Sequence, residues 1–265
     1  MRLLYIAEIV GKPGLFALRH TLEELKQRYQ PDILWGNGDG ATGGFGLGLN
    51  HAHTLRKLGL QVITLGECAF YKKDVHPLLA SSHFLLRPEN LPEEAPGQGW
   101  QVLKSGPDRV AFLSLVGQAG WNRLTPVSPF TAFDRALERL QGQNIPLLID
   151  FHAVTTAEKQ TLLAYVDGKV AALLGSHAKV ATADAQITSH GTAYVTDAGR
   201  TGSRASIGGF LPEKELQRLQ TGIPLKSEPC WQELVVEGVF LELSHNKGVR
   251  IEPFTQACSV RAPSS

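Results

Sequence analysis

Long apolar runs, paired cysteines and a large excess of charge are all missing from the 265-residue sequence. No stretch approaches the roughly 18 apolar residues that a membrane-spanning helix needs, so we expect no membrane association. The formal net charge is +1. No global field therefore favours a nucleic-acid duplex, and an anionic ligand must be recognised by a local site. The three cysteines are odd in number and widely spaced, which indicates a reducing, cytoplasmic location rather than a disulfide framework.

The remaining composition is that of a folded globular chain, with 43% hydrophobic and 19% charged residues. We expect one α/β domain over residues 1–258, with a more antiparallel second half, and a frayed tail over residues 259–265. The patterns predict strands at 3–10, 33–35, 62–65, 100–103, 110–115, 146–151, 170–174, 192–196, 234–243 and 249–254. They predict helices at 15–29, 51–58, 130–140, 157–166 and 212–220, and a turn at 11–14.

Five predicted strands run into residues that can bind a metal or transfer a proton. These are Glu8 after LLYIA, Asp39 after ILWGNG, Glu67 and Cys68 after VITLG, His152 after PLLIDF, and His177 after AALLGS. In open α/β sheets the carboxyl ends of the strands share one edge, and ligands bind beyond it. Carboxylates and imidazoles together suit manganese, iron or zinc. The pattern therefore predicts a metal site at this edge.

Each of these residues also has an ordinary structural interpretation. A histidine at the end of a strand is often structural, and Asp39 could cap a turn in its glycine-rich loop. Other motifs are excluded more firmly. The segment GNGDGATGGFG lacks the helix and the acidic residue of a dinucleotide site. Pro13 follows Lys12 where a P-loop needs Ser or Thr, and no GxSxG elbow occurs.

With these residues located, the chain resembles the calcineurin-like metallophosphoesterases, and more narrowly the bacterial YmdB-type phosphodiesterases. The resemblance covers most of the chain. It includes IVGKPG, NGDGATGGFG, RPEN, DFHAVTTAEKQ, DGKVAALLGSH and GTAYVTDAGRTG. It implies an α/β fold in which two mixed β-sheets pack face to face, flanked by helices, with a metal cluster at the strand ends.

The active-site positions depart from the family pattern. Glu8 stands for an aspartate, Asp39 and Gly40 for glutamate and asparagine, Glu67 and Cys68 for asparagine and histidine, and Lys179 for the second histidine of the last motif. Only His152 and His177 keep the family's residue type. The resemblance thus implies a metal site that has degenerated in part.

The resemblance further implies that one metal survives. Asp39, Glu67, His152 and His177 correspond to the ligands of the family's second metal, and all four can coordinate. The first metal would rely on Glu8, Asp39 and position 179, where an ammonium cannot coordinate and repels a dication. We expect one manganese, iron or zinc ion per chain rather than two. The Lys179 ammonium would pair with Glu8 or Asp39 in the other position, or else point to solvent.

Two functions remain open. The first is metal-dependent hydrolysis of a small phosphate ester, such as a cyclic nucleotide, with weak or altered activity. Lys179 and Cys68 are its catalytic candidates, although a thiol is a poor replacement for the family's histidine. The second is a catalytically silent member that binds a phosphorylated ligand or a protein partner. Lys12, Arg200 and Arg204 could contact an anion in either case, and relatives suggest a homo-oligomer.

Overall fold

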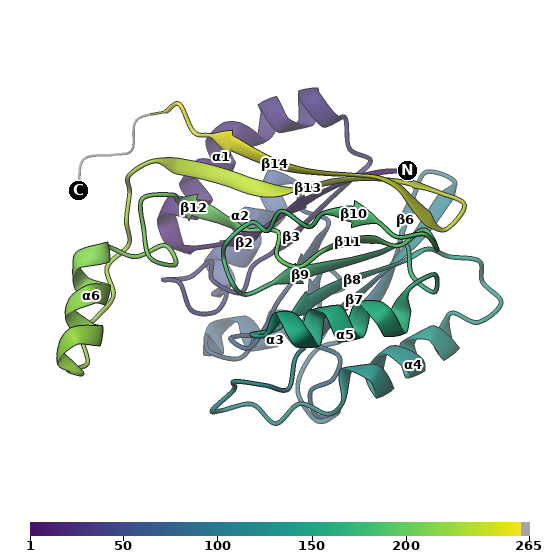
Figure 1. The fold of residues 1–265 in the computed structure, drawn as a ribbon, viewed down its shortest axis with the longest axis horizontal. Coiled ribbons are helices and arrows are strands. Elements are labelled where there is room, and N and C mark those ends of the chain that lie inside the picture. Colours follow the sequence, from purple (N-terminus) through teal and green to yellow (C-terminus); the bar gives the residue numbers. More distant parts are fainter. Residues whose placement is uncertain (261–265) are drawn as a thin grey trace.

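Two mixed β-sheets form the centre of the computed structural model, which describes residues 1–260, and helices cover both outer faces (Figure 1). The first sheet has the order β2-β12-β13-β1-β3-β4-β5, with β14 paired to β13. Its strands are β1 (Arg2–Ile6), β2 (Glu8–Ile9), β3 (Ile33–Asn37), β4 (Val62–Thr64), β5 (Leu85–Leu86), β12 (Arg200–Ser203), β13 (Leu234–Ser244) and β14 (Lys247–Ala257). The expected fold class is confirmed.

The second sheet has the order β10-β11-β9-β8-β7-β6. Its strands are β6 (Trp100–Ser105), β7 (Asp108–Val116), β8 (Leu147–His152), β9 (Ala172–Ser176), β10 (Gln186–Ile187) and β11 (Ala193–Val195). The helices are α1 (Gly11–Tyr29), α2 (Leu49–Leu58), α3 (His76–Ser81), α4 (Pro129–Arg139), α5 (Thr156–Val166) and α6 (Pro212–Thr221), with a 3-10 turn η1 at Lys73–Val75. No helix among the described residues is long and apolar enough to cross a membrane.

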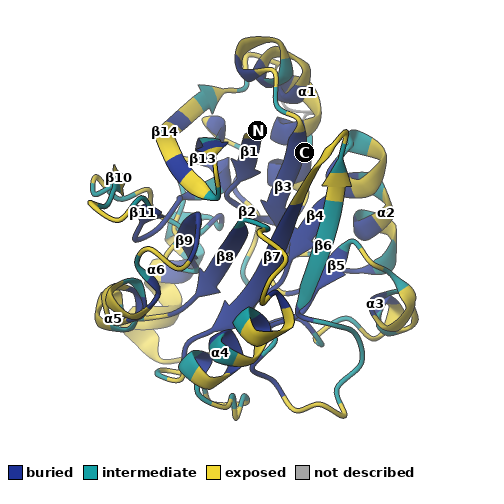
Figure 2. Cartoon of the chain, turned by 90° about the vertical axis from the view of Figure 1, so that its right-hand side faces the viewer, coloured by how far each residue is buried: buried dark blue, intermediate teal, exposed yellow. Residues whose placement is uncertain are grey.

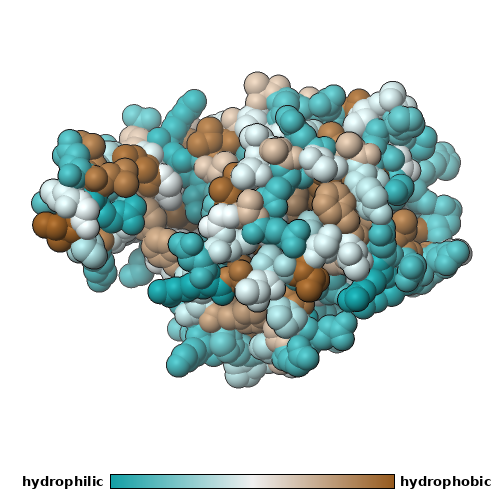
Figure 3. Space-filling view, turned by 60° about the horizontal axis from the view of Figure 1, so that its bottom comes forward, coloured by the Kyte–Doolittle hydropathy of each residue, from teal (hydrophilic) through white to brown (hydrophobic). Residues whose placement is uncertain are grey.

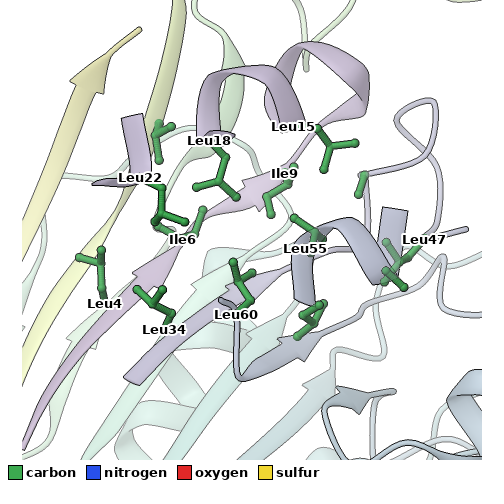
Figure 4. Packing of buried hydrophobic residues seen from close by; sticks show 14 of the residues in the cluster. Leu4, Ile6, Ile9, Leu15, Leu18, Leu22, Leu34, Leu47, Leu55 and Leu60 are labelled. Atoms are coloured by element: carbon green, nitrogen blue, oxygen red, sulfur yellow. The ribbon is translucent and has the colours of Figure 1, made fainter. Parts of the chain in front are cut away.

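The alternation of side chains along the strands builds three apolar layers. On β1, Leu3 and Tyr5 enter the layer between the two sheets, whereas Leu4 and Ile6 face the helices. Figure 4 shows Leu4 and Ile6 packed with leucines of α1 and α2. A third layer lies between the second sheet and helices α4 and α5. Figure 2 shows that the central strands of both sheets are consequently buried, whereas β6, β10 and β14 are partly exposed.

Parallel pairing brings the functional strand ends together. Strands β1, β3, β4 and β5 are mutually parallel, as are β7, β8, β9 and β11. In a parallel sheet the carboxyl ends lie on one edge, and two such sheets face each other here. The segments that follow β3, β4, β8 and β9 therefore converge, and they carry the residues singled out from the sequence.

The amino-terminal prediction was wrong in detail. The expected strand at 3–10 is two strands, because Glu8 and Ile9 leave the neighbours of β1 and pair with β12. The expected turn at 11–14 is the first turn of α1, where Pro13 is tolerated because its missing N–H has no partner there. Gly14 lets α1 lie against β12, since a Cβ atom there would be 2.3 Å from the Thr201 carbonyl oxygen.

The expectation of one domain over residues 1–258 stays a prediction. The expected tail at 259–265 falls largely on residues 261–265, which lie outside the described residues.

Candidate metal centre

The predicted ligands come from the ends of four strands in the two facing sheets. Asp39 lies two residues after β3, and Glu67 follows β4, both in the first sheet. His152 is the last residue of β8, and His177 follows β9, both in the second sheet. Ligand atoms of Glu67, His152 and His177 lie within 4.8 Å of one another, and so do those of Asp39, Glu67 and Cys68. Glu67 belongs to both groups and therefore connects the ligands of the first sheet with those of the second.

Potential metal-ligand atoms lie close together at the centre, and few hydrogen bonds connect them. Nε2 of His152 touches Oε2 of Glu67, lies 3.1 Å from Nδ1 of His177 and is 3.8 Å from Oδ2 of Asp39. Oε2 of Glu67 is buried and has no aligned hydrogen-bond donor despite that contact. Gly66 provides the space, since a Cβ atom there would lie 2.4 Å from the His152 ring.

A chain of hydrogen bonds behind His152 fixes its orientation. Nδ1 of His152 lies 2.9 Å from Oγ of Ser176, and that hydroxyl donates to Oδ1 of Asp150 at 2.7 Å. Because the hydroxyl proton goes to Asp150, the histidine donates its Nδ1–H to Ser176. Oδ2 of Asp150 accepts from Tyr5, at 3.0 Å, and from Asn37, at 2.9 Å. When this imidazole is neutral, its Nε2 lone pair is directed at the centre, as in a metal-binding histidine.

Charges within the centre shift the pKa values of its residues. Burial lowers the pKa of His152, but the Glu67 carboxylate outweighs burial and raises that pKa to about 9. Burial raises the pKa of Glu67, yet His152 and then His177 hold it well below its usual range. Burial, followed by repulsion from Glu67, raises the pKa of Asp39. The Glu67 carboxylate and the His152 imidazolium therefore stabilise each other while no cation is bound.

Lys179 forms an ion pair with Glu8 beside this centre. The ammonium nitrogen lies 3.0 Å from Oε1 of Glu8, and the lysine side chain is only 19% exposed. Burial lowers the pKa of Lys179, but Glu8 raises it further, so the net shift is upward and the ammonium persists. Gly40 leaves room for the longer glutamate, since a Cβ atom there would lie 2.9 Å from Oε1. The contact expected from the sequence is present, and Lys179 does not point to solvent.

The loop that carries His177 and Lys179 has an unusual backbone. Both residues have positive φ angles, of 95° and 60°, which residues other than glycine rarely adopt. Asp197 accepts a hydrogen bond of 2.9 Å from the N–H of Ala178 and one of the same length from the buried Lys159 ammonium. Arg200 donates to the carbonyl oxygen of Lys179 at 2.7 Å. These contacts hold a strained loop in place.

The expectation that Arg200 contacts an anion does not fit this geometry. Its guanidinium also donates to the carbonyl oxygens of Ser203 and Arg204. Three backbone acceptors occupy it, so Arg200 orients the loop.

Cys68 contributes to the centre through its backbone as well as its thiol. Its N–H donates to Oδ2 of Asp39 at 3.1 Å, while the N–H of Gly66 donates to Oδ1 at 2.7 Å. These bonds orient Asp39 and leave further lone pairs on both oxygens. Burial, followed by repulsion from Asp39, raises the pKa of the Cys68 thiol. Cys68 therefore remains a thiol, a poor nucleophile.

Several contributors were not found from the sequence. The sequence pattern assigns no role to Asp150, Asp197 or Trp121. The Trp121 ring packs edge-on against His177, with ring centroids 5.0 Å apart, and stacks beside His152 at 6.2 Å. A carboxylate inside the run LLIDFH is the one local signal that could have indicated Asp150, because a buried charge needs partners.

The donor set fits a divalent metal. Two carboxylates and two imidazoles are the oxygen and nitrogen ligands that manganese, iron and zinc accept. Oε2 of Glu67 is buried without an aligned hydrogen-bond donor, and a bound cation would replace the His152 proton as its partner. Paired sheets with such a cluster at their strand ends define a calcineurin-like metallophosphoesterase.

Comparison with known proteins identifies the family. Residues 4–254 match the family model described as "YmdB-like protein", and the chain belongs to that family. It is 33% identical, over 95% of its length and 96% of the relative's, to a protein of Bacillus subtilis (strain 168) named "2',3'-cyclic-nucleotide 2'-phosphodiesterase". Two crystal structures share the fold over 97% of this chain. One is a hypothetical protein from Thermus thermophilus, with a TM-score of 0.90, 34% identity and 99% of that chain covered. The other is a novel phosphatase from Mycoplasma pneumoniae, with a TM-score of 0.91, 28% identity and 93% of that chain covered.

Proposed function

We propose that this metallophosphoesterase is a phosphodiesterase with one divalent metal, acting on a small phosphoester such as a cyclic nucleotide. Asp39, Glu67, His152 and His177 would hold the metal. The observation that carries the proposal is the convergence of these four residues from both sheets, with a lysine ion pair beside them. The name of the Bacillus subtilis relative supports a cyclic nucleotide as the substrate.

The metal, when bound, would polarise a phosphoryl oxygen and lower the pKa of a water molecule. The other steps belong to residues of this chain. The Lys179 ammonium lies beside the centre and would stabilise the negative charge that develops on the phosphate. Asp150 and Ser176 keep the His152 lone pair directed at the centre. Cys68, as a buried neutral thiol, is a weak proton donor for the leaving group.

The alternative is a catalytically silent protein that binds a phosphorylated ligand or a protein partner. The loss of the histidine at position 68 and of a ligand at position 179 favours it. The four retained ligands favour a metal-bound state, and a bound metal would supply the Lewis acid that the enzyme needs.

A hydrolysis assay tests the proposal. The protein is freed of metal, resupplied with manganese, iron or zinc, and assayed on a 2',3'-cyclic nucleotide and on an aryl phosphodiester. We expect metal-dependent turnover that His152→Ala reduces at least about 100-fold. His53→Ala, at an exposed position of α2, is the matched control and should retain activity. Absence of turnover with all three metals would contradict the proposal.

Self-association also stays a prediction, and α6 is the surface that supports it. This helix projects from the body of the molecule (Figure 1). Leu216 and Leu219 on it are exposed, the latter by 75%, and Ile223 extends the apolar surface. Figure 3 shows hydrophobic atoms gathered on this projecting part. Light scattering on the parent and on Leu219→Asp would test the prediction, with a smaller mass expected for the variant. Equal masses would remove α6 from consideration.

A further inference from the structure

A second ligand site is indicated around Arg87, which follows β5 in the RPEN segment. This residue is only 5% exposed, yet no carboxylate oxygen among the described residues lies within 4.0 Å of its guanidinium. One hydrogen bond, of 2.7 Å, runs from its Nη1 to the carbonyl oxygen of Pro88, while its Nε is buried without a partner. Arginine is rarely buried unless it is paired. The side chain is therefore short of an acceptor.

Arg87 lines a pocket of about 420 Å³, a size that suits a small ligand. The pocket lies among the segments that follow β5, strand β6 and helix α4, which Figure 2 places near one another. Two further arginines of α4, Arg135 and Arg139, line it as well. Its apolar walls include Leu91, Val127 and Trp100, and Glu89, Glu93 and Gln98 also line it.

The carboxylates of this pocket do not neutralise Arg87. One oxygen of Glu89 accepts from Arg139 at 2.7 Å, and the other accepts from the N–H of Gly99 at 3.0 Å. Glu93 is 89% exposed and lies 3.5 Å from Arg135. Three guanidinium groups thus share the pocket with two carboxylates, and both carboxylates are paired with the arginines of α4 rather than with Arg87. The pocket carries surplus positive charge at its most buried arginine.

We propose that this pocket binds a small organic anion, whose carboxylate or phosphate-type head pairs with Arg87 while its apolar part packs against Trp100. The planar guanidinium fork matches both head groups. This site is separate from the metal centre, since its lining residues include none of the metal ligands. It stands independently of the proposed phosphodiesterase function.

Indole N–H signals in two-dimensional NMR test this proposal, because the chain has only four tryptophans and two of them lie at the sites of interest. Trp100 reports on the Arg87 pocket and Trp121 on the metal centre. The probes are benzoate and phenylphosphonate, which share a ring and differ in their head group, with neutral benzamide as control. We expect saturable movement of the Trp100 signal with at least one anion and none with benzamide. The anion that binds more tightly identifies the head group.

Two variants connect the signal to the arginine. Arg87→Gln should weaken anion binding at Trp100 about tenfold or more, and should leave any response of Trp121 unchanged. Arg19→Gln, on an exposed position of α1, should change neither. Because Arg87 lacks a partner, Arg87→Gln should also melt, without ligand, at the same or a higher temperature than the parent. Should it fail to fold, Arg87→Lys keeps the charge without the fork and should weaken binding to a smaller extent.

The proposal would be overturned by a Trp100 signal that responds to neither anion. It would equally be overturned if Arg87→Gln, or Arg87→Lys in its place, kept full anion binding. A lower melting temperature for Arg87→Gln together with unchanged binding would assign Arg87 a structural role.

Discussion

Replacing Lys179 by methionine should leave the buried Glu8 carboxylate without its counter-ion. At the observed N–O distance of 3.0 Å and an effective dielectric constant near 20, the pair is worth about 5 kcal/mol. The lysine is 19% exposed, so solvent screens part of this attraction. We therefore expect Lys179→Met to lower the free energy of unfolding of the metal-free protein by about 3 kcal/mol.

A double-mutant cycle measures the coupling directly. Urea unfolding in the presence of a chelator is followed for the parent, Lys179→Met, Glu8→Gln and the double variant. The double variant should recover much of the stability, since both charges are gone, giving a coupling energy of about 2 kcal/mol or more. Lys26 and Glu23 form a matched exposed pair, with an N–O distance of 2.7 Å, and should couple by only about 0.5 kcal/mol.

The reasoning would be refuted if the two cycles gave equal coupling energies. A cost below about 1 kcal/mol for Lys179→Met would refute it as well, because a buried carboxylate cannot lose its cation so cheaply.

Three further variants or conditions test the surroundings of the centre. Asp197→Asn leaves the buried Lys159 without its carboxylate, and should cost about 3 kcal/mol in urea unfolding; less than 1 kcal/mol would contradict the role of this pair. The raised pKa of His152, about 9 against an ordinary 6.5, should stabilise the metal-free protein fully below pH 6.5. That contribution, at most about 3 kcal/mol, should be lost as the pH rises through 9. If the unfolding free energy of His152→Gln depended on pH in the same way as that of the parent, the assignment to His152 would be wrong. Gly66→Ala should push the His152 ring aside and weaken manganese binding in calorimetry about tenfold or more, whereas unchanged affinity would show that the space is not needed.

The strand pattern predicted the meeting of the ligands for a physical reason, whereas the family resemblance implied the two facing sheets. Apolar runs of strand length, each followed by a polar residue, indicate buried parallel strands whose ends lie on one edge. Asp39, Glu67, His152 and His177 obey that rule, and the structure brings them together. The family resemblance implied that Lys179 lies beside the carboxylates, and its positive charge then predicted the ion pair.

The support behind these ligands could not be predicted in the same way. Asp150 accepts hydrogen bonds from residues on four other strands, and Tyr5, one of its donors, is 145 positions distant in the sequence. Arg200 was expected to meet an anion, yet it holds the backbone of Lys179. Such contacts depend on the register of the sheets and on loop conformation. No short stretch of sequence carries that information.

The break in the first strand has a similar cause. Residues 3–10 form one apolar run, and only the pairing partners of Glu8 and Ile9 reveal that the chain moves to β12. This shift places Glu8 within reach of Lys179, so the expected ion pair forms even though the strand ends earlier than predicted.

Metal content per chain tests the central claim most directly. The parent and Lys179→His are freed of metal, resupplied with manganese, iron or zinc, and analysed by mass spectrometry after removal of unbound ions. We predict one ion per chain in the parent, and a second in Lys179→His, where an imidazole replaces the ammonium that pairs with Glu8. Two ions in the parent, or none under any supply, would contradict the account.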